Sequence, residues 1–174
     1  MNPRSEDTDL ETRRGAVTRL DDGRQRLEFR RSWPDAIEDV WAALTEPDRL
    51  SRWIGVYEGE RRPGGSGTFA MTQEEGDSPG QGTTIVECDP PRRLVVEWEP
   101  TEYGHWRVEL DLWAEDGSTV LRFVQHFPAD TDVIDMALGW HWYLDGLGAE
   151  IDGGTPPRDW DAFVADVGPG YRPA

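Results

Sequence analysis

The residues of this sequence most able to do chemistry are its three histidines and its single cysteine. His105 and His126 are expected on the outward face of neighbouring strands, where a nearby carboxylate would let them hold a metal. Two solvated histidines on a sheet surface explain the same pattern without a metal. Cys88 precedes Asp89, whose negative charge disfavours the reactive thiolate. These residues therefore do not predict a catalytic or metal site.

Catalysis needs a nucleophile, a base or a metal held in a pocket, and the sequence offers no clear pair of this kind. His141 falls at the edge of a buried helical stripe, where it either reaches a cavity mouth or is satisfied by water or backbone. No glycine-rich loop follows a strand and opens a helix, so we expect no phosphate-binding cradle. We therefore expect no cofactor and no metal, and we favour a protein that is not an enzyme.

Gln125 is the one polar residue expected within an inward-facing apolar set. Two alternating strand-like runs meet at the Asp116-Gly117 turn, which pairs their apolar positions on one face. These positions are Trp106, Val108, Leu110, Leu112, Leu121, Phe123, Gln125 and Phe127. Two interpretations of Gln125 stand. It orients the polar end of a ligand, or a backbone group or a water molecule satisfies it.

An amphipathic helix over residues 132–152 is the longest element that the sequence predicts. Its apolar residues recur at spacings of three and four, the period of a helix with one buried face. That stripe contains Val133, Ala137, Trp140, Leu144, Leu147 and Ile151, and is widened by Met136 and Tyr143. Leu138 and Trp142 are expected on the opposite face. They form either a contact surface, such as a dimer interface, or a surface that the segment around Trp160 covers.

The segments around this helix predict a sheet and two short helices. Two strands joined at Asp22-Gly23 come first, followed by short helices at 36–45 and 48–53. From residue 54 to 127 the period changes to two, and turn-like connections imply antiparallel neighbours. We expect one domain over 15–167, a disordered polar tail over 1–14 and a tail over 168–174.

Composition limits the partners and the compartment. The net charge is -17, and all eighteen basic residues are Arg. The negative electrostatic potential of such a protein repels nucleic acid and anionic lipid, so we expect neither as a partner. A local cluster of Arg side chains could still hold one anionic group. A single cysteine excludes internal disulfides. The sequence contains no apolar run long enough for a signal peptide or a membrane span, so a cytoplasmic location is expected.

Three ordered motifs resemble a known family. LEFRRSWPDAIEDVWAALTEPDRLSRWIG at 27–55, VECDPPRRLVVEWE at 86–99 and GWHWYLDGL at 139–147 are similar to segments of proteins related to the C-terminal domain of the activator of the heat-shock-protein-90 ATPase. This family is a branch of the START-like, or SRPBCC, superfamily. The resemblance implies an α+β helix-grip fold, in which a curved antiparallel sheet wraps a long C-terminal helix and leaves a cavity between them.

The resemblance and the nine tryptophans together predict an aromatic cavity. A buried tryptophan removes roughly 200 Å² from water, so these side chains must line a dense core or a pocket. The expected cavity residues are Trp53, Phe69, Trp98, Trp106, Phe123, Gln125, Met136 and Trp140. We therefore expect a small hydrophobic or aromatic ligand and no catalysis. The alternative is a protein-interaction or co-chaperone-like module, and a cyclase or hydrolase of the superfamily is less favoured.

Substitutions on the two faces of the long helix test this assignment. Trp140→Ala should reduce ligand binding or stability more than Trp142→Ala, because only Trp140 is expected to face the sheet. Thermal melts and titrations with an aromatic ligand measure the two effects. Equal losses in both variants would contradict the assignment of faces.

Overall fold

The computed structural model describes residues 9–73, 79–101 and 104–172. Eight strands form one antiparallel sheet in the order β1-β2-β8-β7-β6-β5-β4-β3. They are β1 (Ala16–Arg19), β2 (Gln25–Trp33), β3 (Gly55–Gly59), β4 (Ser66–Met71), β5 (Gln81–Asp89), β6 (Arg93–Thr101), β7 (Gly104–Glu115) and β8 (Ser118–Phe127). The helices include α2 (Ile37–Thr45), α3 (Pro47–Trp53), α4 (Val133–Asp152) and α5 (Trp160–Tyr171).

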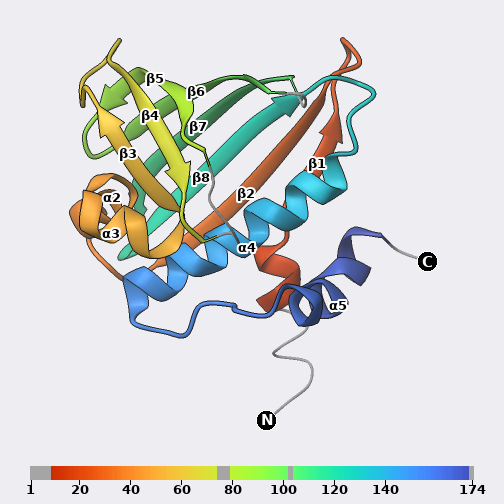
Figure 1. Cartoon of the computed structure of the whole chain (residues 1–174). Coiled ribbons are helices and arrows are strands. Elements are labelled where there is room, and N and C mark those ends of the chain that lie inside the picture. The colour runs from red at the N-terminus through yellow and green to blue at the C-terminus, as the bar shows by residue number, and fades with distance from the viewer. Residues whose placement is uncertain (1–8, 74–78, 102–103, 173–174) are drawn as a thin grey trace.

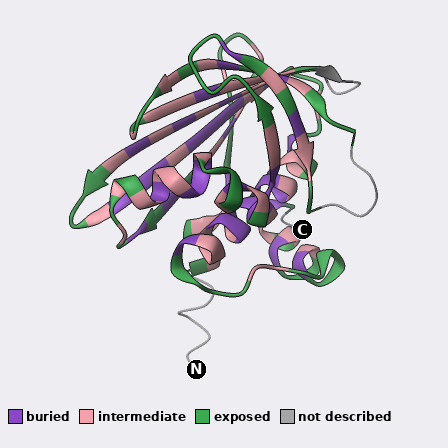
Figure 2. Ribbon diagram, turned by 60° about the vertical axis from the view of Figure 1, so that its left-hand side comes forward, coloured by how far each residue is buried: buried purple, intermediate pink, exposed green. Residues whose placement is uncertain are grey.

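The sheet curves over α4, and α2 and α3 lie beside the strands at one end of the molecule (Figure 1). The predicted fold class is confirmed: a curved antiparallel sheet wraps a long C-terminal helix, with two short helices near the N-terminus. Buried residues occur along the central strands of the sheet and along α4 (Figure 2). Among the helices of the described residues, none has the length and hydropathy needed to cross a membrane.

The two hairpins predicted from Asp-Gly sequences are both present. Gly23, with φ of 85°, turns β1 into β2, and Asp116 and Gly117 turn β7 into β8 with φ of 50° and 78°. Positive φ at both central residues gives a turn whose twist matches that of the flanking strands. Val108 therefore pairs with Gln125 and Leu110 with Phe123, which confirms the predicted inward face.

Helix α4 is held by caps at its ends and by its buried face along its length. The Asp132 side chain accepts a hydrogen bond from the Ile134 amide at 3.1 Å, and Gly153 ends the helix in the left-handed region. These contacts satisfy backbone groups that a helix end leaves unpaired. Leu144 and Leu147 are almost fully buried, and each such side chain contributes about 2 kcal/mol. Packing on the sheet thus fixes the helix that the apolar stripe predicted.

The ends of the domain extend beyond the predicted boundaries. Residues 9–13, which we expected in a disordered tail, are helical, and Arg13 pairs with Asp145 of α4 at 3.0 Å. Residues 1–8 of that expected tail lie outside the described residues. Helix α5 continues to Tyr171, whose hydroxyl accepts a hydrogen bond from the Gly15 amide at 2.7 Å. Both terminal segments therefore pack against the body of the protein.

Helix α5 covers the outer face of α4. The Trp142 ring lies 5.5 Å from that of Trp160 and 5.2 Å from that of Phe163, centre to centre, and Leu138 is buried. The exposed contact surface considered for Leu138 and Trp142 is therefore wrong, and cover by the C-terminal segment is confirmed. Because Trp142→Ala also opens a packed contact, ligand binding separates it from Trp140→Ala more clearly than thermal melting does.

Candidate functional site

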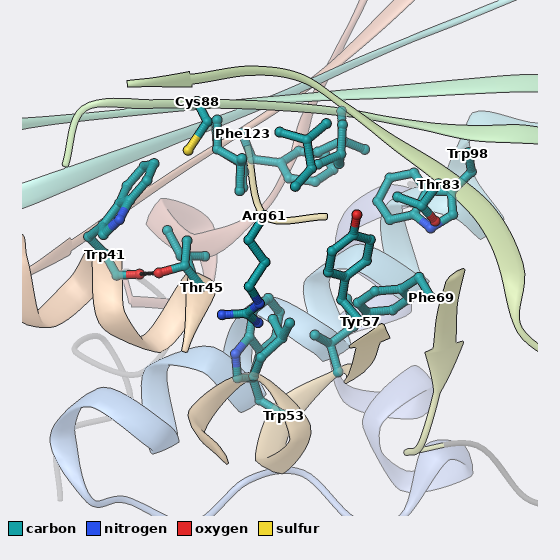
Figure 3. Close-up of a pocket in the computed structure, with 18 of the residues that line it drawn as sticks. Trp41, Thr45, Trp53, Tyr57, Arg61, Phe69, Thr83, Cys88, Trp98 and Phe123 are labelled. Carbon is teal, nitrogen blue, oxygen red and sulfur yellow. Dashed lines mark hydrogen bonds between the residues drawn. The ribbon is translucent and has the colours of Figure 1, made fainter. Parts of the chain in front are cut away.

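A cavity of about 280 Å³ lies between the sheet and the helices α2, α3 and α4 (Figure 3). Pockets for small molecules are typically concave and mainly apolar, with a few placed polar groups. The lining residues are Trp41, Leu44, Thr45, Leu50, Trp53, Ile54, Tyr57, Arg61, Phe69, Thr83, Ile85, Cys88, Leu94, Val96, Trp98, Val108, Leu110, Phe123, Trp140 and Leu144.

Three kinds of element build these walls. Alternation along β4 to β8 turns every second side chain inward and supplies the concave wall. Trp140 and Leu144, four residues apart on α4, supply the facing wall. Helices α2 and α3 close one end, and Trp53 is fixed there because its indole Nε1 donates to the Ala43 carbonyl oxygen at 2.8 Å.

The aromatic walls hold one another in place. The Phe123 and Trp140 rings lie 4.6 Å apart between centroids, and Trp98 lies 6.5 Å from Trp140. Phe69 packs edge-on against Trp98 at 5.9 Å. Ring pairs at these separations are favourable beyond the area they bury. The cavity is therefore bounded by mutually packed rings that span α4 and three strands of the sheet.

Most polar groups of the lining already bond to the protein. The Thr45 hydroxyl donates to the Trp41 carbonyl oxygen at 2.8 Å, and the Thr83 hydroxyl donates to the Gln81 carbonyl oxygen at 3.0 Å. Burial raises the pKa of the Cys88 thiol, and the charge of Asp89 raises it further. The cysteine therefore stays protonated at neutral pH, as the sequence predicted.

Tyr57 and Arg61 stand where the cavity meets solvent. Tyr57 is half-buried, and its hydroxyl donates to the Glu60 carbonyl oxygen at 2.9 Å. Burial raises the pKa of the Tyr57 phenol, and the neighbouring Glu60 raises it further. Arg61 is exposed, and its side chain extends between the aromatic groups of the lining in the view of Figure 3.

The structure places the expected cavity residues in two groups. Trp53, Phe69, Trp98, Phe123 and Trp140 line the cavity. Trp106, Gln125 and Met136 are not among the lining residues. The inward-facing strand and helix positions thus extend past the end of the cavity into packed core.

The second group has physical reasons for its position. The Gln125 Oε1 accepts a hydrogen bond from the Trp140 indole at 2.7 Å, so it bonds to the protein rather than to a cavity ligand. In the described part of the chain, the Gln125 Nε2 has no hydrogen-bond partner. Trp106 packs 6.3 Å from Trp140, and Met136 is half-buried one helical turn before it.

Several lining residues were missing from the prediction. Trp41 shares a face of α2 with Val40 and Leu44, so its helical spacing could have marked it. Thr83 alternates with exposed Thr84 on β5, but Cys88 follows a register shift between Ile85 and Glu87, so a strict period of two does not place it on the same face. Arg61 lies in the connection between β3 and β4, where neither period applies. Its place at the cavity depends on tertiary structure alone.

The histidines considered first do not form a site at the cavity. No group of three or more His, Cys, Asp or Glu residues suited to a metal occurs among the described residues. The His105 Nε2 lies 3.6 Å from a Glu97 carboxylate oxygen on the outer sheet surface. Burial lowers the pKa of His126, and the nearby Arg24 lowers it further.

His141 lies in a separate buried cluster on the far side of α4. Its Nδ1 is 2.9 Å from the Tyr171 hydroxyl, and its Nε2 is 3.5 Å from an Asp145 oxygen. Asp145 also pairs with Arg31 at 3.4 Å. Burial lowers the pKa of His141 to about 3, and the neighbouring Arg31 and Arg13 lower it further. His141 is therefore neutral at pH 7 and joins α4 to α5.

The sheet, the long helix and the cavity between them define the helix-grip class of the SRPBCC superfamily, a fold that fits ligand-binding and cyclase-like proteins. Residues 36–152 match the family model described as "Activator of Hsp90 ATPase homolog 1-like protein". This match covers more than half of the chain, and the chain belongs to this family. A search of curated proteins found no match.

Solved structures share the fold over three quarters or more of this chain. CalU16 from Micromonospora echinospora is 25% identical with a TM-score of 0.69, over 90% of this chain and 94% of CalU16. The protein encoded by gene BPP1335 from Bordetella parapertussis is 26% identical with a TM-score of 0.68, over 91% and 90% of the two chains. DynU16, "a putative protein in the dynemicin biosynthetic locus", shares the fold at 21% identity with a TM-score of 0.63. The match covers 75% of this chain and 48% of DynU16.

The His141 cluster predicts a pH dependence of stability. Because the folded-state pKa of about 3 lies below the ordinary value of 6.5, unfolding takes up a proton between these values. This lowers the free energy of unfolding as the pH falls. His141→Gln should therefore lose about 2 kcal/mol less stability than wild type between pH 7 and pH 5.

Urea unfolding at the two pH values measures this difference. His105→Gln is the matched control, because His105 is exposed on the sheet surface and should follow wild type. If His141→Gln loses as much stability on acidification as wild type, His141 is not held neutral by the fold.

Proposed function

We propose that this protein binds one small hydrophobic or aromatic molecule in the cavity between its sheet and α4, without transforming it. The observation that carries this proposal is the cavity of about 280 Å³ with walls of packed aromatic and aliphatic side chains. Transfer of an apolar ring from water to such walls is favourable by about 25 cal/mol for each Å² buried. A cytoplasmic location is part of the proposal, because one unpaired cysteine suits a reducing compartment.

The chemistry of the lining favours binding over catalysis. Its ionisable side chains, among the described residues, are the Tyr57 phenol, the Arg61 guanidinium and the Cys88 thiol. General acid-base catalysis at neutral pH needs a group whose pKa lies near 7. The pKa values of the phenol and the thiol are both raised, which moves them away from that range. The lining is thus better suited to holding a ligand than to moving protons.

A second candidate is a protein-interaction role. The family description names an activator of an ATPase, which favours a partner of the chaperone class. Under this alternative the protein would raise the turnover of a purified Hsp90 ATPase. No stimulation at saturating concentration would exclude it. The two candidates differ in the surface used, because ligand binding requires the cavity.

Filling the cavity tests the binding proposal. Thr83 is buried and lines the cavity, whereas the neighbouring Thr84 is exposed and lies on the other face of β5. Thr83→Trp should weaken binding of the neutral fluorophore N-phenyl-1-naphthylamine by at least about tenfold, because the new indole occupies the ligand's space. Thr84→Trp is the matched control and should bind as wild type does.

Fluorescence titration measures the affinity, and thermal unfolding confirms that each variant is folded. Wild type should show saturable binding at one site. Absence of saturable binding, or equal affinity in the two tryptophan variants, would contradict the proposal.

A further inference from the structure

Arg61 is the one charged residue in the cavity lining, as far as the structure describes the chain. Among the described residues that line the cavity, it is also the only exposed one, so it marks the solvent end of the cavity. The other end is formed by buried rings, including Phe123 and Trp140. The cavity therefore has an apolar interior and a cationic mouth.

The guanidinium of Arg61 is unpaired in the described part of the chain. The adjacent acidic residue, Glu60, bonds instead to Arg62, with 3.0 Å between Glu60 Oε2 and Arg62 Nη2. Within the ranges that the structure describes, twelve other arginines form ion pairs with carboxylates. In a protein with a net charge of -17, a free guanidinium beside an apolar cavity has its donors available for a ligand.

Most hydroxyl and indole donors of the cavity lining already form hydrogen bonds within the protein. The hydroxyls of Thr45, Thr83 and Tyr57 each donate their one hydrogen to a backbone carbonyl oxygen. The indoles of Trp53 and Trp140 donate to Ala43 and Gln125. The indole N–H groups of Trp41 and Trp98 and the Cys88 thiol also line the cavity, but they are neutral, so an anionic group entering it would find its one charged donor on Arg61. A guanidinium presents its N–H groups as a planar fork that matches a carboxylate or a sulfonate.

We propose that the ligand is an amphipathic monoanion, with an aromatic body in the cavity and one anionic group at the mouth bound by Arg61. This inference rests on the proposed function and adds the class of ligand. The acidic surface of the protein repels polyanions such as nucleotides, so a single anionic group on a largely apolar body fits best. Arg61 thus sets both the orientation of the ligand and its preference for an acid.

Two fluorophores that differ by one sulfonate test this assignment. 8-Anilinonaphthalene-1-sulfonate has the ring system of N-phenyl-1-naphthylamine with an added anionic group. Arg61→Gln should weaken binding of the sulfonate roughly tenfold, because a charge-assisted hydrogen bond is lost. Binding of the neutral amine should change by less than about twofold, since it offers no anion to Arg61.

Arg62→Gln is the matched control. It removes the same charge one residue away, from a side chain that pairs with Glu60 and does not line the cavity. Both fluorophores should bind this variant as they bind wild type. Raising the salt concentration should weaken binding of the sulfonate to wild type more than to Arg61→Gln.

The outcomes separate the two proposals. Binding of both fluorophores with no selective loss in Arg61→Gln overturns the role of Arg61 and leaves the cavity proposal standing. An equal loss of sulfonate binding in the Arg61 and Arg62 variants also overturns it, because net charge then explains the effect. Binding of neither fluorophore to wild type overturns the cavity proposal and this inference with it.

Discussion

The hydrogen bond between the Trp140 indole and the Gln125 side chain fixes the long helix against the sheet. The Trp140 Nε1 and the Gln125 Oε1 lie 2.7 Å apart, and Gln125 has no exposed surface. A buried donor left without a partner costs about 1–3 kcal/mol, so a rotation or shift of α4 that broke this contact would be penalised. The contact sets where the Trp140 ring lies. That ring separates the packed part of the helix-sheet interface from the cavity.

The two faces of α4 next to this hydrogen bond contact different parts of the protein. Trp140 and Leu144 face the cavity, while His141 and Asp145 face α5 and the N-terminal segment. Successive helical residues point about 100° apart, so one short sequence supplies both faces. The cluster around His141 makes α4 a packed core helix on both sides. The side that encloses the cavity is therefore backed by a layer of packed side chains.

The sequence predicted the fold because its periods are clear. The stripe from Val133 to Ile151 and the alternation through β7 and β8 are properties of single elements and survived unchanged. The ends were less predictable. Residues 9–13 and the last turns of α5 are polar or contain Gly and Pro, and their order depends on contacts such as Arg13 with Asp145 and Tyr171 with Gly15. Those contacts join residues far apart in the chain, which local patterns do not reveal.

For the site, the sequence predicted which side chains point inward, but not which of them line the cavity. Alternation places Gln125 on the inner face together with Phe123, but only the tertiary structure shows that Phe123 lines the cavity whereas the Gln125 side chain bonds to Trp140. Arg61 had no such signal, because it stands in a connection between strands. A polar residue in a loop acquires its role from the walls that fold around it.

The central claim is that the interior beside Trp140 is an open site for a small apolar molecule. A crystal structure of the complex with N-phenyl-1-naphthylamine tests it most directly. The account predicts that the naphthalene ring lies in the cavity, in contact with Trp98, Phe123 and Trp140. A ring bound on the outer surface, or an interior in which the lining side chains have closed the cavity, would contradict it.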